Sequence, residues 1–148
     1  MEKLKVQIHK VDKDLPTPKY KCYGDAGMDL YAAETALLTP GDIKKIKTGV
    51  RFAIPYGYEI QIRPRSGLAS KYGISIINTP CTIDAGYRGD IDIPIINHGK
   101  TAYEIKKGER IAQAVFKKVE IVELEEVEAL EENTERGSGG FGSTGQFN

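Results

Sequence analysis

The sequence predicts an all-β fold, either a sandwich or a barrel, with one short helix. Short runs of alternating apolar and polar residues recur along the chain, and turn-forming residues separate them at short intervals. Alternation with a period of two is typical of strands that bury one face, and the close spacing of the turns argues against alternating strands and helices. A length of 148 residues suits one domain with a single core.

The predicted elements follow from these patterns in chain order. Apolar side chains alternate in five predicted strands, bounded by Leu4 and Ile8, Val50 and Ile54, Tyr58 and Ile62, Ile91 and Ile95, and Ile111 and Ile121. Turn-forming residues fall at 40–42, 55–57, 97–99 and 107–109. A short helix is predicted over Ser66 to Tyr72, where Leu68, Ala69 and Lys71 lie between two glycines.

The C-terminal segment differs from the rest of the chain. Residues 120–135 carry eight glutamates and no basic residue, and their apolar positions fit a strand or a helix, so part strand and part linker is predicted. Residues 136–148 hold five glycines and little to bury, which predicts a flexible tail. We therefore expect a β domain over 1–135 and a flexible glycine-rich strap over 136–148.

Composition and charge limit the classes of partner and the compartment that the sequence predicts. The 21 basic and 21 acidic residues balance, so no global field favours nucleic acid or a membrane as the partner. Residues 1–119 nevertheless carry 20 basic and 13 acidic side chains, which suits a small polyanion. No apolar run approaches the ~20 residues of a membrane helix, and the first residues lack the apolar core of a signal peptide. Two cysteines are too few for a disulfide framework. We expect a cytoplasmic protein with reduced thiols.

The tail formally contains the dinucleotide pattern G-x-G-x-x-G, but its context fits no dinucleotide fold. Only three residues follow Gly145, so no helix can hold a pyrophosphate, and a P-loop would need lysine where Ser143 stands. One arginine, one aromatic ring, hydroxyls and free backbone N–H groups remain, a composition able to wrap a phosphorylated ligand that contains a ring. The alternative is a solubilising tail.

Two further segments carry candidate site residues. Arg63, Arg65 and Ser66 lie at a predicted strand end before the helix, where Arg65 and Ser66 either converge on a phosphate, or Ser66 merely caps the helix and both arginines face solvent. Arg63 points opposite to Arg65 in a strand, so we expect at least one of the two to be structural. Asp84 lies in a predicted hairpin turn, where it is either functional or bonded to its own turn. With two histidines there is no zinc-protease motif and no Ser-His-Asp set in prospect, so catalysis would rest on a carboxylate, arginine and a metal brought by the ligand.

Taken in order, five segments resemble the five motifs of the homotrimeric dUTPase family, whose members hydrolyse dUTP to dUMP and pyrophosphate. The segments are Ala26 to Ala32, Arg65 to Gly67, Asn78 to Gly89, Arg110 to Gln113 and Arg136 to Gly145. The resemblance spans nearly the whole chain. It implies a jelly-roll-like β-barrel that assembles as a homotrimer, with each active site built from all three subunits.

The resemblance also implies roles for residues in the third motif. Asp84 would be the general base that deprotonates the water attacking the α-phosphorus. Tyr87 would stack on the deoxyribose and leave no room for a 2′-hydroxyl. Asn78, Asp92 and backbone groups of Thr82, Ile83 and Asp84 would bind the uracil edge.

The other motifs would hold the phosphates. Arg65, Ser66, Gly67 and Gln113 would bind them directly, while Arg136, Ser143 and Thr144 would close over the β and γ groups. Phe141 would cover the uracil, and Gly142 belongs to the same binding strap. Mg²⁺ would be held chiefly by the triphosphate, with Asp29 acting through a coordinated water.

One departure and two alternatives accompany this resemblance. Cys81 stands where the third motif commonly has glycine, which puts uracil selectivity in question. A dCTP deaminase, or its bifunctional form, shares the fold, but Pro94 stands where its catalytic glutamate is expected, and Arg65-Ser66-Gly67 replaces Arg-Ser-Ser. A non-catalytic β-sandwich binding module is the third reading, and it assigns no role to Asp84 or the tail.

Overall fold

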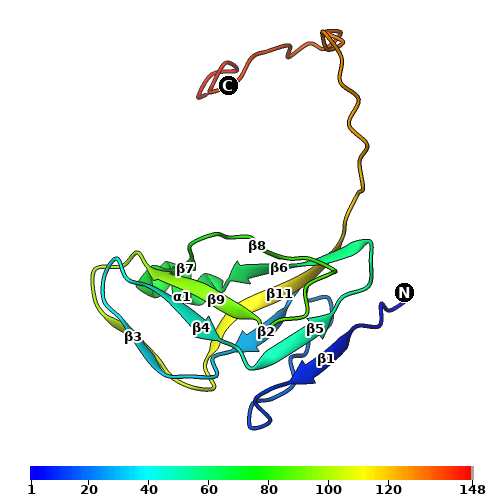
Figure 1. Ribbon diagram of the computed structural model, residues 1–148. Coiled ribbons are helices and arrows are strands. Elements are labelled where there is room, and N and C mark those ends of the chain that lie inside the picture. The colour runs from blue at the N-terminus through cyan, green and yellow to red at the C-terminus, as the bar shows by residue number, and fades with distance from the viewer. Residues whose placement is uncertain (148) are drawn as a thin grey trace.

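The computed structural model describes residues 1–147 and contains eleven strands and one short helix in that range (Figure 1). The elements are β1 (Gln7–Lys10), β2 (Met28–Tyr31), β3 (Ala36–Leu38), β4 (Ile43–Lys47), β5 (Val50–Ala53), β6 (Tyr58–Pro64), α1 (Ser66–Tyr72), β7 (Ile74–Ile76), β8 (Cys81–Ile83), β9 (Asp92–Asn97), β10 (Tyr103–Ile105) and β11 (Arg110–Lys118). The prediction of an all-β fold with one short helix is confirmed. Its jelly-roll-like description is consistent with the four small sheets, although they form no closed barrel.

A four-stranded antiparallel sheet in the order β2-β11-β6-β8 forms the centre of the molecule. Strand β11 pairs with β6 from Ala112 opposite Pro64 to Lys118 opposite Tyr58. The start of β11 therefore lies beside the end of β6. On its other side β11 pairs with β2, with Gln113 opposite Asp29, so three segments far apart in the sequence meet at one end of this sheet.

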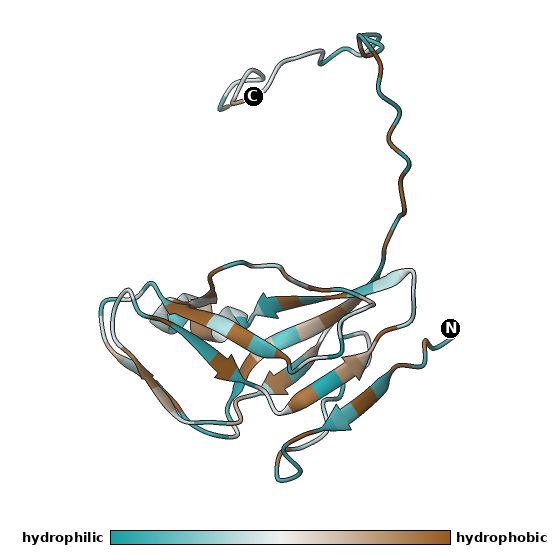
Figure 2. Cartoon of the chain, viewed as in Figure 1, coloured by the Kyte–Doolittle hydropathy of each residue, from teal (hydrophilic) through white to brown (hydrophobic). Residues whose placement is uncertain are grey.

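A three-stranded sheet in the order β4-β9-β7 contributes to the same core, and two strand pairs, β1-β5 and β10-β3, complete the body. The strands bury apolar side chains at alternate positions, as a half-buried pleated strand requires. Figure 2 shows this as alternating brown and teal bands along the strands. Fully buried side chains from both larger sheets form one core, among them Leu30, Ile46, Ile60, Ile62, Ile74, Ile93, Ile95 and Ile111.

The helix α1 spans Ser66–Tyr72, as the sequence predicts. Leu68 anchors it to the core, and it ends at Gly73, whose φ of 70° is the left-handed conformation common after helices. A Cβ at Gly73 would come within 2.6 Å of the backbone nitrogen of Gly99, so this position also needs the absence of a side chain. The helix is thereby fixed directly after Arg65.

The residues after β11 leave the body (Figure 1). The last backbone bond to the body joins Val119 N–H to the Gly57 carbonyl, and no strand or helix forms from there to residue 147. The predicted part-strand over 120–135 is thus wrong for the single chain, because no neighbouring strand offers hydrogen bonds to it. Asn148, at the end of the predicted strap, lies outside the described residues. Within 1–147, no helix has the length and apolar character needed to cross a membrane.

Candidate active site

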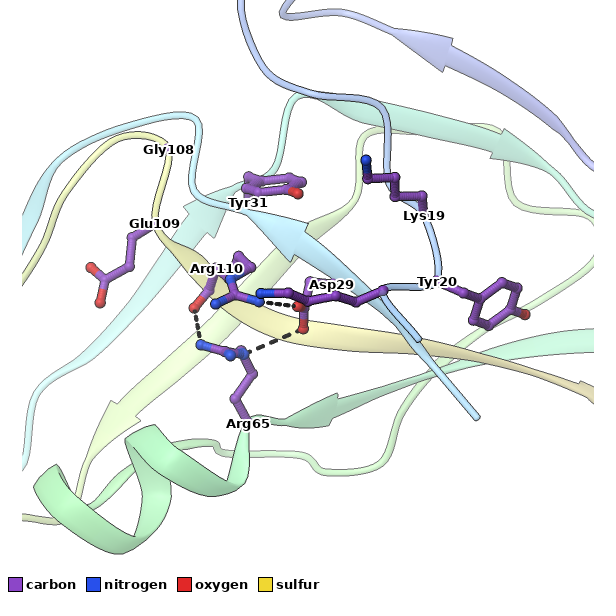
Figure 3. A pocket seen from close by; sticks show the side chains of 9 residues that line it. Lys19, Tyr20, Asp29, Tyr31, Arg65, Gly108, Glu109 and Arg110 are labelled. Carbon is purple, nitrogen blue, oxygen red and sulfur yellow. Dashed lines mark hydrogen bonds and ion pairs between the residues drawn. The ribbon is translucent and has the colours of Figure 1, made fainter. Parts of the chain in front are cut away.

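One carboxylate joins two arginines at the end of the central sheet where β2, β6 and β11 meet (Figure 3). Asp29 Oδ1 lies 3.3 Å from Arg65 Nε, and Asp29 Oδ2 accepts a hydrogen bond of 3.0 Å from Arg110 Nη1. Arg65 Nη1 also donates to the Arg110 carbonyl at 3.3 Å. Because each guanidinium is held by Asp29, the remaining N–H groups point in fixed directions and are available to a ligand.

Close packing places Gln113 beside this cluster. Its Nε2 donates to the Pro64 carbonyl at 3.4 Å, and a Cβ on Gly27 would come within 2.7 Å of its Oε1. A side chain at residue 27 would displace the Gln113 amide and crowd the Ala114 carbonyl, which lies 3.2 Å from the same Cβ position. The structure thus brings together Asp29, Arg65 and Gln113, as the sequence predicts, and adds Arg110.

A cavity of 740 Å³ opens over the cluster. It is lined by Lys19, Tyr20, Lys21, Asp29, Tyr31, Arg65, Gly108, Glu109 and Arg110. The lining side chains include four cations and two carboxylates, so the cavity carries an excess of positive charge. Such a cavity suits an anion with several phosphate groups.

Glu109 is bound to the protein rather than turned to the arginines. Its Oε1 accepts a hydrogen bond from the Tyr103 hydroxyl, and its Oε2 accepts one of 3.1 Å from Lys106 N–H. Burial and this hydrogen bond to Glu109 raise the pKa of the Tyr103 hydroxyl well above its usual value. Tyr103 therefore remains a donor that keeps Glu109 in place.

The start of α1 lies next to the cluster. Arg65 is the N-cap residue in an extended conformation and forms no side-chain cap bond, so Ser66 does not cap the helix. Arg65, which lines the cavity, directly precedes Ser66 and Gly67 in the sequence. A Cβ at Gly67 would meet no atom within 4 Å. The backbone here is open to an approaching ligand.

A second, smaller cavity of 260 Å³ surrounds Asp84. It is lined by Lys45, Thr82, Ile83, Asp84, Tyr87, Asp90 and Asp92. The Asp84 carbonyl accepts a bond of 3.0 Å from Tyr87 N–H, which closes a tight turn after β8. Among the described residues, no donor or cation binds the Asp84 carboxylate. The alternative that this side chain only bonds its own turn therefore has no contact to support it.

The ring of Tyr87 is fixed beside Asp84. Its hydroxyl donates to the Asp90 carbonyl at 2.8 Å, and a Cβ at Gly89 would collide with the ring. A hydrogen bond of 2.6 Å from Arg51 Nε to Asp90 lowers the pKa of the Asp90 carboxyl and ties this loop to β5. With 45% of its surface exposed, Tyr87 offers a ring face to a ligand.

Asp92 presents an unpaired acceptor in the same cavity. Its Oδ1 is buried and has no hydrogen-bond partner within the described part of the chain. A buried carboxylate oxygen without a partner is costly, so such atoms are usually matched by a ligand or water. Asp92 is suited to accept an N–H from a bound base.

The two cavities lie at opposite ends of β6. Ile83 pairs with Ile60 and Cys81 with Ile62, so the residue after β8, Asp84, lies level with Glu59. Arg65 is six residues further along, which at about 3.3 Å per residue is a separation of roughly 20 Å. The Asp84 cavity and the arginine cluster of one chain therefore cannot hold the same phosphate group.

The remaining predicted residues lie away from both cavities in the single chain. Asn78 is exposed in the turn before β8 and lines neither cavity. The strap forms only local bonds, such as Arg136 Nε to the Gly139 carbonyl at 2.9 Å, and Phe141 is fully exposed. Gly142, Ser143 and Thr144 lie in the same exposed turns.

Cys81 is accommodated in the core of the hairpin. It is 8% exposed, pairs with Ile62, and is not among the residues with positive φ, so the backbone here does not need the freedom of glycine. Sequence reasoning from the motifs missed several lining residues, namely Lys19, Tyr20, Lys21, Tyr31, Lys45 and Asp90. The basic and aromatic run from Lys19 to Lys21 was the one local signal for the first three.

Comparison with known proteins gives consistent results. A family model described as dUTPase matches residues 13–145. A deoxyuridine 5'-triphosphate nucleotidohydrolase of Nautilia profundicola is 52% identical over 143 residues, covering 97% of this chain and 100% of the relative. The enzyme of the same name from a Thermoanaerobacter species is 51% identical over 144 residues, covering 95% and 97%.

Solved structures agree with the sequence relatives. A mutant dUTPase of Staphylococcus bacteriophage 80alpha with dUpNHpp superposes with a TM-score of 0.89 at 34% identity, covering 96% of this chain and 99% of that one. A mutant dUTPase of phage phi11 of S. aureus, described with a structural Mg(II) ion, has a TM-score of 0.80 at 30% identity and covers 86% and 99%.

Proposed function

The chain belongs to the dUTPase family, and on that premise we propose how its residues hydrolyse dUTP to dUMP and pyrophosphate. It is a hydrolase, a dUTP diphosphatase. The reaction limits the uracil available for incorporation into DNA and supplies dUMP for thymidylate synthesis. We also propose that it takes place in the cytoplasm, where the chain's free thiols would stay reduced.

Asp84 is the general base of the reaction. Its carboxylate has no partner among residues 1–147 and lines a cavity large enough for a nucleoside, so it can accept a proton from a water within hydrogen-bond reach. The water oxygen bonds to the α-phosphorus while the bond from that phosphorus to the bridging oxygen of pyrophosphate breaks. The water proton goes to Asp84, and pyrophosphate leaves with the bonding electron pair.

Residues around Asp84 select deoxyuridine. The fixed Tyr87 ring stacks on the sugar where a 2′-hydroxyl would collide, and backbone groups of Thr82 and Ile83 bind the uracil edge. Asp92 Oδ1 accepts the N3–H of uracil, which cytosine lacks. Asn78 completes the base site from the turn before β8. A site built of fixed polar groups rejects a base that leaves them unpaired.

The arginine cluster binds the phosphates. Arg65 is oriented by Asp29, and Ser66, Gly67 and Gln113 surround it, so donors converge on one anion. Because this cluster and Asp84 of one chain lie roughly 20 Å apart, the substrate bridges two chains. We propose a homotrimer in which one subunit supplies Asp84 and its neighbour supplies Arg65.

The C-terminal segment joins the subunits. Apolar side chains of residues 119–130 are exposed in the single chain, with Ile121 at 85% and Leu124 at 88%, although exposed apolar surface of this kind normally lies in an interface. This segment packs on a neighbouring subunit. The strap that follows closes over the nucleotide, with Arg136, Ser143 and Thr144 on the outer phosphates, Gly142 within the contact and Phe141 over the base.

Mg²⁺ fits this site as a metal carried by the substrate. Both oxygens of Asp29 are already held by arginines, and no group of three acidic, histidine or cysteine side chains within residues 1–147 is arranged to hold a metal. Mg²⁺ commonly keeps its waters and binds through substrate phosphates, and Asp29 can accept a hydrogen bond from one such water. When bound, the ion would neutralise part of the triphosphate charge.

The free Asp84 carboxylate beside a fixed aromatic ring is the observation that carries this proposal. The test is the release of pyrophosphate from dUTP, dCTP, dTTP and UTP by the purified protein. We expect turnover with dUTP and at most traces with the other three. Equal turnover of dCTP or release of ammonia would point to a deaminase instead, although Pro94 offers no acid or base. Asp84→Asn should bind dUTP and lose most turnover, and near wild-type rates in that variant would refute the base assignment.

A further inference from the structure

The 740 Å³ cavity contains two lysines that the reaction described above does not use. Lys19 and Lys21 line it together with Arg65 and Arg110, and within residues 1–147 neither lysine forms an ion pair. In Figure 3, Lys19 lies on the loop to the right of Tyr31 and of the Asp29–arginine cluster. The two arginines share the charge of Asp29, so the lysines are the surplus positive charge of this cavity.

The loop that carries the lysines is held in place. Asp25 Oδ2 accepts hydrogen bonds from the backbone N–H groups of Lys21 at 3.2 Å and Cys22 at 2.7 Å. Asp25 N–H in turn donates to the Cys22 carbonyl at 3.3 Å. The Asp25 carboxylate thus binds backbone and fixes the position of Lys21, whose ammonium forms no ion pair within residues 1–147.

We propose that Lys19 and Lys21 form an anion subsite for the β- and γ-phosphates of the substrate and for the pyrophosphate that leaves. This inference rests on the proposed function and extends its phosphate site beyond Arg65, Ser66, Gly67 and Gln113. Lys19, Lys21 and Arg65 line one cavity, so a polyphosphate chain that begins at Arg65 has the lysines within the same cavity for its outer groups. They hold the leaving group, and free pyrophosphate competes with dUTP there.

The test compares the double variant K19Q/K21Q with the wild type. A matched control, K3Q/K5Q, removes two equally exposed lysines that precede β1 and line neither cavity. We expect K19Q/K21Q to raise KM for dUTP and the inhibition constant of inorganic pyrophosphate by the same factor, about 3- to 10-fold for two exposed cations. KM should change more than kcat, because lysines that bind the outer phosphates equally in the ground state and the transition state supply uniform binding.

The monophosphate product separates this subsite from a general effect. Because dUMP has no outer phosphates, its inhibition constant should be unchanged in K19Q/K21Q. Added salt should weaken pyrophosphate inhibition of the wild type more than that of the variant. Equal loss of dUMP binding, or unchanged constants for dUTP and pyrophosphate, would overturn the proposal.

Calorimetry with inorganic pyrophosphate keeps this inference independent of turnover. If the wild type failed to hydrolyse dUTP but bound pyrophosphate in a manner lost in K19Q/K21Q, the subsite would stand and the proposed function would fall. If the wild type hydrolysed dUTP and K19Q/K21Q bound pyrophosphate as tightly as the wild type, the proposed function would stand and the lysine subsite would fall.

Discussion

Mixing two inactive variants should restore activity, because Asp84 and Arg65 of one chain lie at opposite ends of β6. Asp84→Asn removes the proposed general base from one end, and Arg65→Gln removes a proposed phosphate ligand from the other. Each variant alone should form an inactive homotrimer. In a mixed trimer, a site works only where an Arg65→Gln chain supplies its intact Asp84 to a neighbour that retains Arg65.

The expected yield follows from the ring geometry. Any mixed trimer, whether it holds two copies of one variant or two of the other, has one such junction among its three sites, so about one third of the wild-type kcat per chain should return. A mixed dimer would instead recover about one half. Co-expression with two different tags and purification over both resins isolates the mixed species, and pyrophosphate release from dUTP measures the recovery.

The control is each variant purified alone and mixed after assembly, which should stay inactive unless subunits exchange. Size-exclusion chromatography with light scattering checks that all preparations are trimeric. If the doubly purified mixture showed no activity, Asp84 and Arg65 would have to act within one chain, and the register argument would be refuted.

Four other changes have defined outcomes. Ending the chain at Glu135 should leave a folded trimer with turnover reduced by an order of magnitude or more, since closure over the nucleotide is lost; unchanged kinetics would dismiss the strap. Asp92→Asn should reduce dUTP-over-dCTP discrimination in kcat/KM by about 10-fold or more, because an amide can donate to the cytosine N3 that repels a carboxylate. Gly27→Ala forces a Cβ to within 2.7 Å of Gln113 and should raise KM for dUTP. Gly24→Ala, where space is open but φ is 88°, is the control, and thermal melts of both variants separate backbone strain from the effect on the site. The pKa of Tyr103 is raised in the folded state, so its contribution to stability is present below pH 10 and is lost as the pH rises above that value. In urea melts between pH 8 and 11, the free energy of unfolding should therefore fall less with rising pH for Tyr103→Phe than for the wild type.

The longer elements of the fold could be predicted from sequence because their patterns are local. Strand β6 buries Ile60 and Ile62 at alternate positions, and α1 lies between a proline and a glycine in the left-handed conformation. Strands β3, β7, β8 and β10 have three residues each, which is too short for a period to emerge. Strand β4 buries only Ile46 of its five residues, so no apolar alternation marks it in the sequence.

The site was less accessible to local reasoning. Asp29, Arg65 and Arg110 are joined only by strand pairing across the sheet, and no spacing in the sequence reveals that contact. The family resemblance assigned roles to Asp29 and Arg65 and placed Arg110 in its fourth motif without a role. Lys19 and Lys21 fall in a loop without periodicity, and Lys45 enters the Asp84 cavity from β4, a strand that was not predicted. Up to residue 147 the strap bonds only to itself and to nearby Thr134, and Asn78 lines neither cavity, so no contact of the single chain could test their predicted roles.

The length of β6 has a consequence for how activity depends on the amount of protein. In the trimer proposed above, a newly made chain carries both halves of the chemistry but cannot combine them, and it should be inert until it meets its copies. Below the concentration at which trimers form, doubling the number of chains should more than double the rate of dUTP removal, and dilution of the enzyme should silence it without unfolding it.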